Sequence, residues 1–66
     1  MTNVDKITTL YGLLETYKSD MISCLIAHNE RSGAGDTWNA DRYLYEANLF
    51  GKKYNDVLTA IEKMEV

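Results

Sequence analysis

The sequence contains no proline and only one cysteine and one histidine, and the low cysteine and histidine counts each exclude a class of small protein. Because Cys24 is alone, the chain forms no internal disulfide and is not a disulfide-stapled scaffold. With His28 as the only histidine, one chain cannot assemble a zinc site of the Cys/His kind. We therefore expect no metal site and no cofactor.

Long apolar runs and a basic leader are also missing. No run approaches the roughly 18 apolar residues of a membrane-spanning helix, and the first residues show no basic segment followed by an apolar one. We expect a soluble, cytoplasmic protein without a secretory signal or membrane contact. The formal charge of −3 lacks the basic excess of typical nucleic-acid-binding proteins.

What the sequence does contain is helical periodicity on both sides of one polar break. Apolar residues make up 45% of the chain and recur at steps of three and four, as in amphipathic helices. The break contains Gly33 and Gly35 and ends at Asp36 or Thr37, both good helix caps. The sequence predicts a single domain over residues 1–66, with a helix over about 4–29, a loop over about 30–36 and a helix over about 37–64.

The two apolar stripes predict an all-α, antiparallel two-helix hairpin, because a short connection makes the helices neighbours. The first stripe is Ile7, Leu10, Tyr11, Leu14, Tyr17, Met21, Cys24, Leu25 and His28. The second is Ala40, Tyr43, Leu44, Ala47, Phe50, Gly51, Tyr54, Val57, Leu58, Ile61 and Met64.

A lone hairpin of 66 residues is near the lower limit of independent stability and leaves the flanks of both stripes in water. We therefore expect a four-helix bundle dimer or a higher homo-oligomer. In length and layout the chain resembles the plasmid-encoded Rop-type RNA-binding bundles, which are small helical-hairpin dimers. The resemblance is one of layout and assigns no site residue.

A second set of apolar and aromatic residues lies off these stripes. We expect them to cluster at the loop end of the hairpin, whereas the end with the chain termini should be an ordinary solvated surface. Exposed apolar patches rich in Trp, Tyr and Arg mark interfaces. The alternative is that this set is the other side of the oligomer core. The predicted partner-binding residues are Trp38, Arg42, Tyr45, Leu49, Ile22 and Ile26.

No catalytic constellation is recognisable. His28 and Glu30 match the His-x-Glu fragment of zinc deaminases, but the Pro-Cys-x-x-Cys that this chemistry also needs is absent. Cys24 stands four residues before His28 on the predicted core stripe, where we expect it to act as a small apolar residue. We expect a protein that is not an enzyme and has no catalytic residue.

The function favoured by the sequence is that of a small, acidic, non-enzymatic interaction protein. Such a helical-bundle oligomer would bind and regulate or inhibit a partner protein, as accessory inhibitors of phages and mobile elements do. One alternative is an oligomer that sequesters an anionic ligand such as a nucleotide, with phosphates on Arg31, Lys52 or Lys53 and a base stacked on Trp38 or Tyr45. A second, less favoured alternative is an RNA- or DNA-binding bundle.

Overall fold

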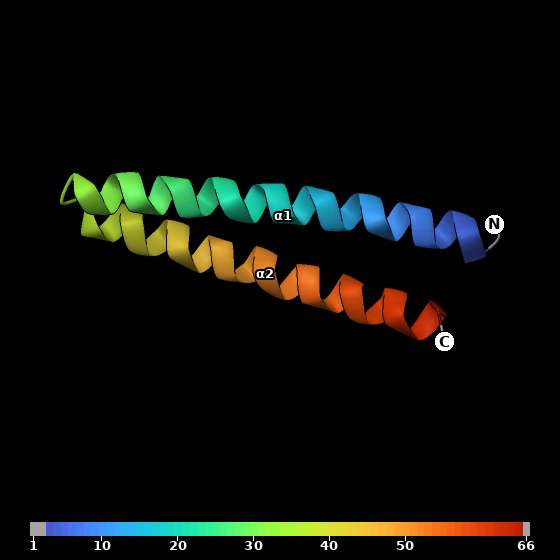
Figure 1. Ribbon diagram of the computed structural model, residues 1–66. Coiled ribbons are helices and arrows are strands. Elements are labelled where there is room, and N and C mark those ends of the chain that lie inside the picture. Colours follow the sequence, from blue (N-terminus) through green and yellow to red (C-terminus); the bar gives the residue numbers. More distant parts are fainter. Residues whose placement is uncertain (1–2, 66) are drawn as a thin grey trace.

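Two helices joined by a tight turn form the molecule (Figure 1). The computed structural model describes residues 3–65, with helix α1 over Asn3–Gly33 and helix α2 over Thr37–Glu65. The helices run antiparallel, so that both termini lie at the end opposite the turn (Figure 1). The all-α hairpin predicted from the sequence is confirmed.

The molecule is a rod that measures 49 × 14 × 13 Å. Its radius of gyration is 15.1 Å, whereas a compact domain of this length would have one of about 11 Å. Figure 1 also shows that the helices lie closest near the turn and diverge toward the termini. A rod of two helices has no interior beyond the line where the helices meet.

The connection is shorter than predicted because α1 continues past residue 29 to Gly33. Gly35 has a φ of +79°, in the left-handed region that favours glycine. The Gly35 N–H donates to the Ser32 carbonyl at 3.1 Å, and the Asp36 N–H donates to the Arg31 carbonyl at 2.9 Å. These two bonds form a Schellman motif, in which Gly35 is the left-handed residue after the end of α1.

Asp36 closes the turn and caps α2, as the sequence predicts. Its backbone carbonyl accepts a hydrogen bond from the Ala40 N–H at 3.0 Å. Its carboxylate accepts from the Asn39 side-chain amide at 2.7 Å and from the Asn39 backbone N–H at 3.4 Å. The side-chain bond from Asn39 is the main cause that lowers the pKa of Asp36. A carboxylate therefore occupies the positive end of the α2 dipole.

The two helices meet along a narrow seam. His28 Nδ1 lies 2.8 Å from the Ala40 carbonyl oxygen, and the Tyr17 and Phe50 rings lie 6.5 Å apart between centroids. These contacts set the register, with His28 level with Ala40 and Tyr17 level with Phe50. Small alanines on α2 allow the close approach. Among the side chains that the structure describes, the buried ones are Leu14, Ala40, Ala47 and Ile61.

Three members of the predicted stripes are exposed instead of buried. They are Tyr11 at 46%, Leu25 at 38% and Leu44 at 38%. Each stands four residues after a seam position, on the flank of the stripe, and two helices alone cannot cover a flank. At the terminal end the polar outer positions are exposed, as expected, and Val4 and Leu13 are single exposed apolar side chains among them.

Candidate interaction surface

The most exposed aromatic side chains form one line along α2. Trp38 is 72% exposed, Tyr45 is 65% exposed and Leu49 is 43% exposed. With about 3.6 residues per turn, these positions lie roughly half a turn away from the buried Ala40 and Ala47. They therefore point away from α1. We call Trp38, Arg42, Tyr45, Leu49 and Lys52 the outer stripe of α2.

Arg42 places a cation between the two aromatic residues of the outer stripe of α2. Its Nε lies 3.5 Å from the Glu46 Oε1, an i,i+4 pair in which the Arg42 side chain remains 62% exposed. An exposed pair of this kind contributes little to stability. Arg42 stands four residues after Trp38 and three before Tyr45 on the same helix, and its side chain stays accessible. Trp, Tyr and Arg are the residue types of binding hot spots.

Ile22 and Ile26 are exposed at 44% and 54%, but they lie on α1. Ile26 is about half a turn from the seam residues Cys24 and His28, so it points away from α2. The outer faces of the two helices point in opposite directions. The structure therefore brings the predicted partner-binding residues to one half of the rod but divides them between two surfaces.

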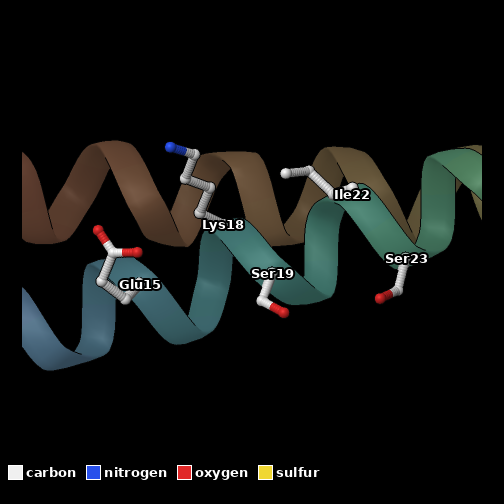
Figure 2. Close-up of a pocket in the computed structure, with 5 residues that line it drawn as sticks. All are labelled: Glu15, Lys18, Ser19, Ile22 and Ser23. Carbon is white, nitrogen blue, oxygen red and sulfur yellow. The ribbon is translucent and has the colours of Figure 1, made fainter.

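One open depression lies beside Ile22, and its wall consists of α1 residues alone (Figure 2). Its lining residues are Glu15, Lys18, Ser19, Ile22 and Ser23. Figure 2 shows Ser19 and Ser23 pointing to one side and Lys18 and Ile22 to the other. Because no α2 residue closes this depression, a single chain does not enclose a small ligand there.

The three predicted anion-binding residues are not gathered within one chain. Lys53 Nζ lies 5.5 Å from the Phe50 ring centroid and 5.9 Å from that of Tyr17, over the middle of the rod. Arg31 lies in the last turn of α1, about 20 Å farther along the axis at 1.5 Å per residue. Lys52 belongs to the outer stripe of α2. The N-terminus of α2, the natural anion site of a helix, holds Asp36 instead.

The neighbourhood of Cys24 disfavours the thiolate. Burial raises the pKa of the Cys24 thiol, and the carboxylates of Glu46 and Asp20 raise it further. His28, one turn away, directs Nδ1 at the Ala40 carbonyl. A nucleophilic cysteine needs an electropositive setting, so this pair has the wrong electrostatics for that role.

Within residues 3–65, no group of three or more His, Cys, Asp or Glu side chains is placed to hold a metal ion. In the same part of the chain, neither helix is long and apolar enough to cross a membrane. Comparison of the chain with protein-family models, curated proteins and solved structures gave no match. A functional proposal therefore depends on the surfaces of the hairpin.

The sequence interpretation expected the flanks of both stripes to be in water in a lone hairpin, but it did not separate the flank residues from the seam. Leu25 and Leu44 were assigned to the core because they continue the apolar stripes. The available signal was the width of those stripes, which exceeds the contact line that two helices share. Apolar residues on a stripe that is too wide for its partner helix mark a face that a further element can cover.

Proposed function

We propose that this protein is a non-enzymatic interaction protein that assembles into a helical bundle and binds a partner protein through the outer stripe of α2. Binding would regulate or inhibit that partner. One observation carries the proposal: Trp38 and Tyr45, exposed at 72% and 65%, stand on one face of one helix. Large aromatic side chains that are exposed lower the solubility of a protein, and exposed apolar patches usually mark interaction sites. Trp, Tyr and Arg are the residue types that dominate binding hot spots.

The geometry of the stripe suits a partner with an apolar groove and an acidic rim. Trp38, Tyr45 and Leu49 present apolar anchors at helical spacing, the mode by which an amphipathic helix enters a groove. Arg42 and Lys52 flank these anchors with positive charge. Carboxylates beside the groove would therefore steer the partner and set its register.

The test is affinity capture of partner proteins from a cell extract, followed by quantitative mass spectrometry. The wild type is compared with Trp38→Ala/Tyr45→Ala and with Val4→Ala, a matched control that alters an equally exposed residue at the other end of the rod. Loss of hot-spot aromatics should reduce capture of the specific partner at least about tenfold. Unchanged capture by the double variant would remove the proposal.

An anionic ligand or a nucleic acid remains the alternative class of target, and no arrangement within one chain favours it. Either target would need Arg31 and Lys52 or Lys53 brought together from different copies. Thermal shift with nucleotides and an electrophoretic shift with RNA and DNA at low salt examine both alternatives. Stabilisation at low ligand concentration, lost at high salt, would favour them over a protein partner.

A further inference from the structure

The two long edges of the hairpin, on either side of the seam, differ in chemistry. One edge carries Asp20, Glu46 and Lys53, each of which stands one residue before a seam position, Met21, Ala47 or Tyr54. The other edge carries Leu25 and Leu44, each 38% exposed, beside Ile22 at 44%. We call these the charged edge and the apolar edge.

Leu25 and Leu44 share an edge because the helices are antiparallel. Each stands one residue after a seam position, Cys24 or Tyr43, and is therefore turned by about 100° around its helix axis from the seam. Because the two helices are antiparallel and face each other, this turn carries both side chains to the same side of the pair. They are also level along the rod. His28 is level with Ala40, so Leu25, three residues earlier, is level with residue 43.

The apolar edge continues toward the middle of the rod. Gly51, one residue after the seam position of Phe50, lies on the same edge, and the sulfur of Met21 packs over it, 3.5 Å from the place where a Gly51 Cβ would stand. The thioether of Met21 keeps this part of the edge apolar. Farther along, Tyr11 is exposed on this edge.

The exposed area of the chain points to a missing neighbour of defined size. The accessible surface is 4838 Å², whereas a folded monomer of 7.5 kDa would expose about 4,250 Å². The excess is about 600 Å² per chain. Two copies that each cover this excess bury about 1,200 Å² together, the lower bound of a specific interface.

We propose that the apolar edge is the docking surface for a second copy of this chain, in a two-fold symmetric four-helix bundle. A two-fold contact needs a self-complementary surface. The apolar edge meets this need because Leu25 and Leu44 lie level on one edge and can pack on the same pair of the second copy. The charged edge would instead bury Asp20, Glu46 and Lys53 in such a contact, and burying charged groups costs free energy unless each is paired.

This inference rests on the proposed assembly into a bundle and adds which surface makes it. Docking at the apolar edge leaves the outer stripe of α2 exposed on both copies. The dimer therefore presents two outer stripes to partners, and self-association and partner binding use separate residues. A bivalent protein of this kind gains avidity for a partner that is itself dimeric.

The experiment measures mass by size-exclusion chromatography with light scattering for the wild type, Leu44→Glu and Leu13→Glu. Leu13 is a matched control because it is also 38% exposed but lies toward the charged edge. The wild type and Leu13→Glu should have a mass of about 15 kDa, twice that of the chain. Leu44→Glu should shift to the monomer mass. A dimer that withstands Leu44→Glu but not Leu13→Glu would overturn the assignment.

A cross-linking measurement keeps the inference testable if Leu44→Glu fails to fold. In a Cys24→Ser background, Leu25→Cys should form linked dimers with a short bis-maleimide, and Leu13→Cys should not. Cross-linking at Leu13 alone would overturn the apolar edge. Partner capture by Trp38→Ala/Tyr45→Ala is read separately, so failure of the dimer surface and failure of the proposed function give different results.

Discussion

At the scale of single residues, stability depends on very few side chains. Ile61 is 1% exposed, whereas Ile26 is 54% exposed on the outer face of α1. We expect Ile61→Ala to lower the free energy of unfolding by roughly 2–5 kcal/mol, because it removes buried surface and opens a cavity. Ile26→Ala should change it by less than about 0.5 kcal/mol. Urea unfolding followed by circular dichroism at one protein concentration measures both, and equal losses would contradict the seam described above.

Cys24 gives a second prediction at this scale. Its thiol pKa is raised by burial and by the carboxylates of Glu46 and Asp20, so at neutral pH the thiolate fraction is below that of a free thiol. Alkylation by iodoacetamide should be slower than for a small-molecule thiol. Glu46→Gln removes one negative charge, which lowers the pKa and should speed the reaction at fixed pH. An alkylation rate that falls in Glu46→Gln would show that the charge acts in the other direction.

At the scale of the elements, the turn depends on one glycine. Gly35 has a φ of +79°, so Gly35→Ala forces a Cβ into the left-handed region and should destabilise the hairpin by about 1–2 kcal/mol. Gly12 lies inside α1 with open space around its Cα. Gly12→Ala should therefore stabilise by about 0.5–1 kcal/mol. Thermal melts of both variants should shift in opposite directions, and a Tm that does not fall in Gly35→Ala would refute the Schellman turn.

The cap of α2 predicts a pH dependence. The pKa of Asp36 is lowered in the folded protein, chiefly by the hydrogen bond from Asn39. Its contribution to stability is therefore complete above the ordinary pKa of about 3.9 and is lost as the pH falls through the lower folded value. Asp36→Asn keeps a capping side chain that does not titrate in this range. The Tm of the wild type should fall more steeply than that of Asp36→Asn between pH 5 and pH 2, and parallel curves would contradict the cap.

The elements themselves were predictable from local sequence, and the end of α1 was not. Periodicity and the caps indicated two helices and placed the start of α2 near Asp36. The end of α1 was expected near residue 29 because the polar segment with two glycines reads as a loop. Only one of these glycines adopts the left-handed conformation, and the hydrogen bonds that decide between Gly33 and Gly35 are set by backbone geometry.

At the scale of the whole molecule, the hairpin has surfaces of different character. The seam holds the helices together, the charged edge is solvated, the apolar edge is incomplete, and the outer stripe of α2 carries the aromatics. The sequence interpretation named Trp38 and Tyr45 but grouped them with Ile22 and Ile26, because closeness along the rod was treated as sharing a face. The angular position of each residue around its helix axis separates the two groups. These angular positions can be compared between the helices once contacts such as that of His28 with Ala40 set the register.

Trp38 tests the central claim most directly, because it is the only tryptophan and lies on the outer stripe of α2. The fluorescence of the assembled protein should be that of a water-exposed indole, with acrylamide quenching close to that of free tryptophan. Addition of the captured partner should shift the emission to shorter wavelength and protect it from acrylamide. A shifted and protected Trp38 in the purified protein alone would show that the outer stripe is the core of the oligomer, which would contradict its role as a partner-binding surface.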